Sequence, residues 1–330
     1  MSELTHPRDT YALDGGEAAE LAFLSALERG RLHHAWLLVG PEGVGKATFA
    51  YRAARRLLGA KLEPRLGPLG AHPDDPVCRQ IAARAHPDLL VLQRETEDGK
   101  ARKAIPVDEA RRLPDFFSLS PGEAQYRVAI VDAADDLNVN AANAVLKTLE
   151  EPPERGVLFL VSHTPGALLA TIRSRCRRLA FFPPPEEEAV RLVQARADLN
   201  AEDAIRLVRM ARGAPGRALK LAEAGGLAMD DAAREILLSL PKIDYGAMTR
   251  LTDTFRGAEG QERFRLLIDR LAARAHTIAA DRALDGRTGG LDRWAQAWER
   301  LVTLPDEAEA LNLDRADALW TALGELKAVA

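Results

Sequence analysis

The fold of this chain is decided by the stretch Gly40-Pro41-Glu42-Gly43-Val44-Gly45-Lys46-Ala47-Thr48. It follows an apolar run at residues 34–39 that has the character of a buried strand, and it precedes a helical pattern at residues 48–58. Glycines at a strand-to-helix turn let backbone N–H groups face a phosphate, and a lysine beside them neutralises its charge. The stretch therefore predicts a phosphate-binding loop, whose candidate contacts are Gly40, Gly43, Gly45, Lys46 and Thr48.

Short apolar runs continue downstream of this loop and alternate with helical patterns. We expect strands at residues 88–92, 127–132, 156–162 and 178–181. Between the third and fourth strands we expect a helix at about residues 139–150, which stops at Glu151-Pro152-Pro153 because proline cannot continue it. Strands that alternate with helices are typical of a parallel sheet, so the sequence predicts an α/β fold.

The strand patterns end at Phe182-Pro183-Pro184-Pro185, a rigid break in the chain. A compact helical segment follows at about residues 186–224 and is closed by Gly225-Gly226, and from about residue 229 the pattern is helical to the end. We therefore predict an α/β domain at residues 1–183, a small helical domain at 184–226 and a larger helical domain at 227–330. In the last of these, apolar residues recur on one helical face: Phe264, Leu267, Ile268, Leu271, Ala275 and Ile278.

Composition is that of a globular protein and excludes several classes. Of the 330 residues, 47% are hydrophobic and 28% are charged, which favours a packed core over disorder. The net charge of -4 argues against a protein that coats nucleic acid by itself. No apolar run is long enough to span a membrane, the first eight residues do not resemble a signal peptide, and the two cysteines form no disulfide framework. We expect a cytoplasmic protein.

Two groups that ATP hydrolysis needs are missing near the loop. The usual loop places Ser or Thr directly after the lysine, so that the hydroxyl holds Mg²⁺. Here Ala47 takes that position, and Thr48 comes one residue late, rotated by about 100° around the helix. The third strand ends at Asp132, which suits metal support, but Ala133 follows where an acid would polarise the attacking water. The loop therefore identifies the fold, but with these two groups missing we expect the chain not to hydrolyse ATP. Alternatively, Lys46 and Asp132 only maintain the fold.

Two later motifs resemble those of the clamp-loader subunits of bacterial DNA polymerase III, which are AAA+ proteins. They are Asn143-Ala144-Val145-Leu146-Lys147-Thr148-Leu149-Glu150-Glu151-Pro152-Pro153 and Thr171-Ile172-Arg173-Ser174-Arg175-Cys176. The resemblance covers about residues 7–224 by motif, and the helical remainder by length and character. It implies an AAA+ domain, a helical lid and a C-terminal collar that forms the oligomer. Ala47 and Ala133 place the chain with the delta-prime-type members.

The second motif is similar to the Ser-Arg-Cys motif of that family, whose arginine reaches the γ-phosphate bound by a neighbouring subunit. The resemblance implies that Arg175 is a catalytic arginine finger acting in trans, since a guanidinium can stabilise transition-state charge there. The residues alone leave open a basic surface turn made by Arg173, Arg175, Arg177 and Arg178.

Two further positions match motifs of the family. Ser162 matches the polar residue of the first sensor motif. Gly213-Ala214-Pro215-Gly216-Arg217-Ala218-Leu219 resembles the second sensor motif, which implies that Arg217 faces a nucleotide phosphate or, without hydrolysis, ties the lid to the core. With Asp132 and the loop, these residues make up a vestigial nucleotide site that is compatible with passive ATP or ADP binding.

The resemblance implies a subunit of the hetero-oligomeric clamp-loader complex, which helps to load the sliding clamp onto primed DNA during replication. Such a subunit is a component of the DNA-directed DNA polymerase III holoenzyme, requires no cofactor and has no ATPase activity of its own. Its implied partners are the ATPase subunits and the delta subunit, with the sliding clamp and primer-template DNA bound through the complex, and no membrane. The alternatives are an active clamp-loader ATPase, another AAA+ ATPase of DNA metabolism, and a scaffold without any catalytic contribution.

Many bacterial members of the family hold a structural zinc with four cysteines between the first helix and the second strand. Here residues 67–86 keep only Cys78, with His72 and His86 nearby. A structural zinc needs four closely spaced nitrogen or sulfur ligands, so we expect no zinc. Cys176, which follows the proposed finger, is expected to be a small buried apolar residue.

Overall fold

The computed structural model describes residues 5–94, 102–257, 259–286 and 289–329. Residues 1–4, on which the expectation about a signal peptide partly rests, lie outside this range. In chain order the helices and strands are α1 (Glu17–Glu28), β1 (Ala35–Val39), α2 (Lys46–Leu57), α3 (Pro76–Ala82), β2 (Leu89–Gln93), α4 (Val107–Ser118), β3 (Arg127–Asp132), α5 (Val139–Glu150), β4 (Gly156–Ser162), α6 (Ala170–Arg175), β5 (Arg177–Ala180), α7 (Glu186–Ala197), α8 (Ala201–Met210), α9 (Pro215–Glu223), α10 (Gly226–Ser239), α11 (Tyr245–Asp253), α12 (Gly260–Leu284), α13 (Leu291–Ala310) and α14 (Arg315–Val329). Short 3₁₀ turns lie at η1 (Pro7–Asp9), η2 (Pro64–Leu66), η3 (Ala134–Asp136) and η4 (Pro165–Ala167).

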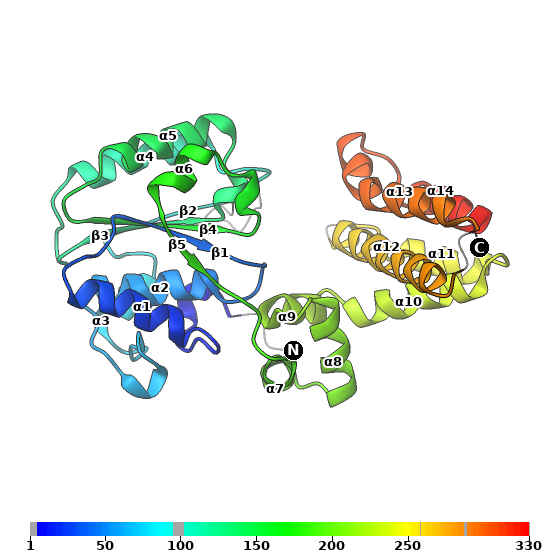
Figure 1. Ribbon diagram of the computed structural model, residues 1–330, viewed down its shortest axis with the longest axis horizontal. Coiled ribbons are helices and arrows are strands. Elements are labelled where there is room, and N and C mark those ends of the chain that lie inside the picture. Colours follow the sequence, from blue (N-terminus) through cyan, green and yellow to red (C-terminus); the bar gives the residue numbers. More distant parts are fainter. Residues whose placement is uncertain (1–4, 95–101, 258, 287–288, 330) are drawn as a thin grey trace. The chain divides into compact units, whose positions relative to one another are not determined.

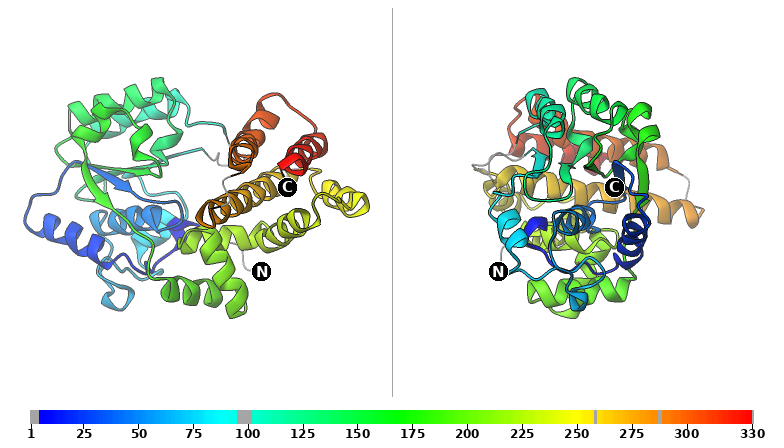
Figure 2. Two further views of the ribbon diagram at one scale, coloured as in Figure 1. Left: turned by 45° about the vertical axis from the view of Figure 1, so that its right-hand side comes forward. Right: turned by 90° about the vertical axis from the view of Figure 1, so that its left-hand side faces the viewer.

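The five strands form one parallel sheet in the order β2-β3-β4-β1-β5. Helices α1 to α3 cover one face and α4 to α6 cover the other (Figures 1 and 2). Successive strand residues therefore point into different cores: Trp36 packs with Phe49 on the first face, whereas Leu37 packs with Leu113 on the second. The predicted α/β class is confirmed, and each predicted strand agrees with an observed one to within one residue at either end.

The described chain divides into two compact units. One comprises Ser2–Arg196 with Val208–Ala218, and the other Ala197–Leu207 with Leu219–Ala330. The first unit contains the sheet and the phosphate-binding loop. The predicted domain boundaries near residues 183 and 226 stay predictions.

Helices α10 to α14 enclose a core of their own in the second unit. The predicted apolar face of α12 is buried there from Phe264 to Ala275, and Ile278 is partly buried. Of the tryptophans in these helices, Trp294 is fully buried and Trp298 is 39% exposed. Asp230 of α10 binds Arg206 and Arg274, which joins α8 and α12 to α10 through one carboxylate. Among the described helices, none is long and apolar enough to cross a bilayer.

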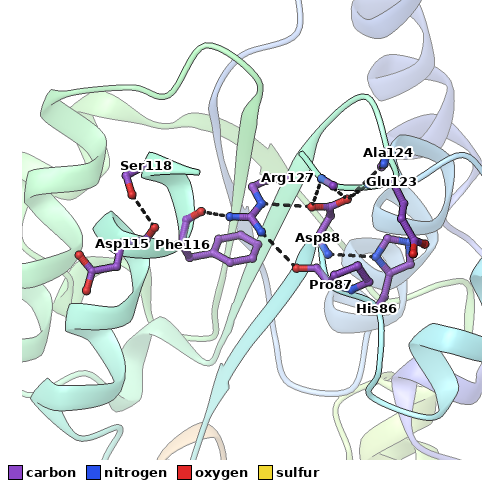
Figure 3. A network of polar contacts seen from close by, with 10 residues as sticks. His86, Pro87, Asp88, Asp115, Phe116, Ser118, Glu123, Ala124 and Arg127 are labelled. Atoms are coloured by element: carbon purple, nitrogen blue, oxygen red, sulfur yellow. Dashed lines mark hydrogen bonds and ion pairs between the residues drawn. The ribbon is translucent and has the colours of Figure 1, made fainter. Parts of the chain in front are cut away.

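A buried ion pair ties β2 to β3 (Figure 3). The carboxylate of Asp88, just before β2, accepts a hydrogen bond from Arg127 Nε at 3.1 Å and further bonds from the backbone N–H groups of residues 122–124. The Arg127 guanidinium also donates to the carbonyl of Phe116 and stacks on its ring at 4.4 Å. Burial raises the pKa of Asp88, but these hydrogen bonds outweigh it and lower the pKa to about 2. The pair links the start of β2 to the start of β3, the strand that ends at Asp132.

Candidate functional site

The phosphate-binding loop connects β1 to α2 as predicted. Gly45 lies just before α2 with φ 89°, a conformation that favours glycine. Gly43 has φ 81°, and a Cβ on it would lie 2.2 Å from the backbone nitrogen of Arg217. Gly216 N–H donates to the Gly43 carbonyl at 2.9 Å. The start of α9 therefore packs directly on the loop backbone, so the structure brings the predicted Arg217 segment to the predicted loop.

Lys46 begins α2 and is buried, with 3% of its surface exposed. Its ammonium donates hydrogen bonds to the carbonyls of Gly40 and Pro41, so it holds the loop that carries it. Burial lowers its pKa to about 8, although the nearby carboxylates of Asp132 and Asp135 oppose this. Thr48 is buried one residue after Ala47, and Ala47 packs against the first core of the sheet.

Residues 10–13, near the N-terminus, pack over the phosphate-binding loop. This packing was not predicted from the sequence. Two buried arginines of α2 hold these residues: Arg52 donates to the carbonyl of Tyr11, and Arg55 donates to the carbonyl of Thr10 at 2.9 Å. This places Leu13 over the loop, where a Cβ on Gly45 would lie 2.4 Å from the Leu13 Cδ1 atom. Arginines on a helix suggest a solvated face, so the pattern alone concealed this packing.

The carboxyl ends of the central strands meet beside the loop. Val39 of β1 pairs with Ser162 of β4, and β3 ends at Asp132 on the other side of β4. Parallel strands end at the same edge of a sheet, so Lys46, Asp132 and Ser162 are brought to one edge. Ala133 follows Asp132 and is buried.

The hydroxyl of Ser162 is engaged by Asp135, a residue to which the sequence analysis gave no role. Ser162 Oγ donates to Asp135 Oδ1 at 3.0 Å, and the backbone N–H groups of His163 and Thr164 donate to the same carboxylate. Burial raises the pKa of Asp135, but these bonds outweigh it and hold the pKa below its ordinary value. The carboxylate therefore fixes the end of β4 to the turn after β3.

His163 is a further polar group at this edge that the sequence analysis missed. Its Nδ1 atom is buried and has no hydrogen-bond partner among the described residues. Burial lowers the pKa of its imidazole, and the nearby charge of Lys46 lowers it further. The only signal in the sequence was its position directly after Ser162, at a strand end.

Arg175 lies at the opposite edge of the sheet, where the strands begin. It is the last residue of α6, and the strand after it begins at Arg177, which pairs with Trp36 near the start of β1. The loop leaves the far end of β1, after Val39, so about four strand residues, or roughly 13 Å, separate the two edges. The structure thus brings the predicted nucleotide residues together and places the predicted finger apart from them.

The side chain of Arg175 is 36% exposed and bound to its own chain. Nη2 lies 3.0 Å from Glu150 Oε1, and Nη1 donates to the Thr171 carbonyl at 3.1 Å. The other arginines of this segment differ: Arg173 donates to the carbonyls of Pro165 and Gly166, and Arg177 stacks on Trp36.

The residues near the expected zinc position take part in local packing and turns. Cys78 is buried with Ala60 and Ala71, and burial raises the pKa of its thiol to about 11, which disfavours the thiolate that a metal needs. His72 and His86 each accept a hydrogen bond from a backbone N–H two residues later. Across the described residues, no three His, Cys, Asp or Glu side chains are grouped as metal ligands. Cys176 is partly buried against the second core of the sheet, where burial raises its pKa to about 12.

Treatment with a metal chelator is expected to leave the stability of this chain unchanged. Because the Cys78 thiol packs in an apolar cluster, dialysis against a strong chelator should not shift the melting temperature. Elemental analysis of the purified chain measures the same property directly. About one zinc per chain, lost in Cys78→Ser, would contradict the expectation.

The fold and the loop together define an α/β protein built around a phosphate-binding loop. Comparisons with known proteins narrow this class. Residues 16–185 match the family model described as DNA polymerase III, delta subunit. That match covers more than half of the chain, which therefore belongs to the DNA polymerase III delta-subunit family.

Curated relatives agree with this family. The chain is 39% identical over 189 residues to DNA polymerase III subunit delta' of Pseudomonas aeruginosa, an alignment of 57% of this chain and 55% of that protein. It is 31% identical over 223 residues to the subunit delta' of Escherichia coli, covering 67% and 64% of the two chains. The chain thus spans less than two thirds of either relative. Among solved structures, the DNA polymerase III gamma-subunit-related protein of Thermotoga maritima aligns with 18% identity and a TM-score of 0.47, covering 93% of this chain and 99% of that chain.

Proposed function

We propose that this chain is a clamp-loader subunit of DNA polymerase III that does not hydrolyse ATP and supplies Arg175 to the active site of a neighbouring ATPase subunit. The observation that carries the proposal is the placement of a partly exposed arginine at one edge of the sheet, with the chain's own phosphate-binding loop at the other. Roughly 13 Å of strand lies between them, so Arg175 cannot serve the loop of its own chain. A trans role is the one that this geometry favours.

The residues around the loop support the absence of hydrolysis. No hydroxyl follows Lys46, because Ala47 is there, and a buried alanine follows Asp132 where an acid would be needed. Lys46 and Asp132 favour the alternative of an active ATPase, but the lysine is bound to the carbonyls of its own loop. The loop sequence is compatible with passive ATP or ADP binding.

The proposed partners are the ATPase subunits and the delta subunit, with the sliding clamp and primer-template DNA bound through the complex in the cytoplasm. Under this proposal the helices from residue 227 onward form the collar, and the short helices of 184–226 form the lid. Co-purification with the other loader subunits, followed by ATPase assays stimulated by clamp and DNA, tests the proposal. If the chain did not enter the complex, the clamp-loader assignment would be lost.

The purified chain is expected to hydrolyse ATP no faster than the variant Lys46→Ala, prepared in parallel to measure background activity. The reason is the double loss at Ala47 and Ala133, which removes a ligand for Mg²⁺ and the group that would activate water. The measurement is steady-state phosphate release with and without clamp and primed DNA. Turnover that DNA stimulates and Lys46→Ala abolishes would favour the active-ATPase alternative instead.

A further inference from the structure

Among the described residues, the guanidinium of Arg175 has one polar contact outside its own helix. The bond to the Thr171 carbonyl is local, because Thr171 lies one turn earlier in the same helix. The contact with Glu150 at 3.0 Å comes from a different helix, α5, which packs beside α6. The direction of the arginine therefore depends on the Glu150 carboxylate.

The electrostatic setting explains why a carboxylate is tolerated at this place. Glu150 is the last residue of α5, where unpaired carbonyl groups carry partial negative charge and disfavour an acid. Arg175 is likewise the last residue of α6, where a cation is favoured. The positive charge of Arg175 offsets the unfavourable placement of the Glu150 carboxylate at the end of α5. The carboxylate and the partial negative charges at the ends of α5 and α6 all attract the same guanidinium.

The size of the interaction decides what the pair can do. Glu150 is 53% exposed, and an exposed ion pair changes an equilibrium by a factor of about five at most. A trans arginine contributes on the order of 10³–10⁵ in rate at a phosphoryl-transfer site. The pair is too weak to withhold the arginine from a phosphate. It is strong enough to restrict the rotamers of a long side chain that would otherwise lose entropy on binding.

Building on the proposed function, we infer that Glu150 is a positioning residue that presents the Arg175 guanidinium to the γ-phosphate of a nucleotide bound by the neighbouring subunit. It acts through the arginine and does not touch the nucleotide. Its effect belongs to turnover, because the nucleotide is bound by the neighbour whether or not the arginine is ordered in advance.

The test is a double-mutant cycle in the assembled loader, with the full chain and its ATPase partners. At the one site that Arg175 serves, isolated by single-turnover hydrolysis, we expect Glu150→Gln to lower kcat for ATP by about two- to fivefold with KM unchanged, and the effect to shrink as salt is raised. In an Arg175→Ala background the same change is expected to have no further effect. Glu151→Gln is the matched control, because the adjacent carboxylate is exposed and makes no ion pair among the described residues.

Each other result overturns the inference in a distinct way. A raised kcat in Glu150→Gln would mean that the pair restrains the arginine. An unchanged kcat would mean that the arginine needs no positioning. An equal loss with and without Arg175 would mean that Glu150 acts by another route. These three results leave the proposed function intact, whereas a wild-type kcat in Arg175→Ala would remove both the proposed function and this inference.

Discussion

Arg175→Ala is expected to leave the chain folded and incorporated in the loader while slowing ATP hydrolysis and clamp loading by its partners. Arg175 is partly exposed and its ion pair is at the surface, so its removal costs the fold little, about 0–1 kcal/mol. At the one site that it serves, the loss is on the order of 10³–10⁵ in rate. A loader contains several ATP sites, so the net slowing is smaller unless the sites fire in strict order. Single-turnover ATP hydrolysis by the assembled complex isolates the affected site.

The best control for this variant is Arg178→Ala. The substitution Arg178→Ala removes the same charge three residues away. The exposed side chain of Arg178 has no hydrogen bond or ion pair among the described residues. Arg173 is a poorer control because its guanidinium binds the carbonyls of Pro165 and Gly166. Arg175→Lys should restore little, since an ammonium lacks the planar two-pronged donor geometry. Equal slowing by Arg175→Ala and Arg178→Ala would point to general electrostatics, and no slowing by either would reduce Arg175 to surface charge.

The second large effect is expected in stability. Asp88→Ala should lower the free energy of unfolding by about 3–5 kcal/mol, because it leaves the Arg127 guanidinium buried and unpaired. It also removes the acceptor for the backbone N–H groups of residues 122–124. Denaturant titration measures the change. Asp115→Ala is the control, because Asp115 is an exposed residue of the nearby α4 and should change stability by less than about 0.5 kcal/mol.

This ion pair also predicts a dependence on pH. The pKa of Asp88 is about 2 in the folded chain, below the ordinary value, so the folded state favours the charged carboxylate. The resulting stabilisation, about 2.5 kcal/mol, is complete above the unfolded pKa near 4 and is lost as pH falls through the folded pKa near 2. The difference in stability between the wild type and Asp88→Asn should therefore be constant near neutral pH and shrink between about pH 4 and pH 2. A difference that stayed constant down to pH 2 would show that the carboxylate charge contributes nothing.

The sequence was sufficient for the centre of the sheet, because β1, β3 and β4 are short apolar runs buried on both faces. Helix α5 agrees with the prediction of about residues 139–150, whose end was given by Pro152 and Pro153, and the structure shows that Asn138 caps its start. The glycine loop was located by local rules that link φ to residue type. The loop also gave Lys46 as a predicted nucleotide residue, whereas Asp132 was predicted from the end of the third strand, and the structure brings the two to one edge.

What the sequence did not yield depends on pairs of residues far apart along the chain. Asp88 looked like the first residue of a strand, and its partner Arg127 lies 39 residues later. Asp135 stood in a run of acids with nothing to mark the one that would bind the end of β4. Glu150 belonged to a recognised motif but had no role until α6 was seen to end beside it. Helical and strand periodicities describe one element at a time and cannot show which elements will meet.

The placement of Arg175 and the phosphate-binding loop at opposite edges of one sheet has a consequence for assembly. Subunits built in this way and joined edge to edge form a row with a direction, in which each gives an arginine forward and accepts one from behind. Under the proposed function this chain can give an arginine to a neighbour. Its own loop does not hydrolyse ATP, so an arginine from another subunit would have no catalytic effect there. Such a subunit fits at one terminus of the row, where it closes the series of working sites and needs no donor behind it.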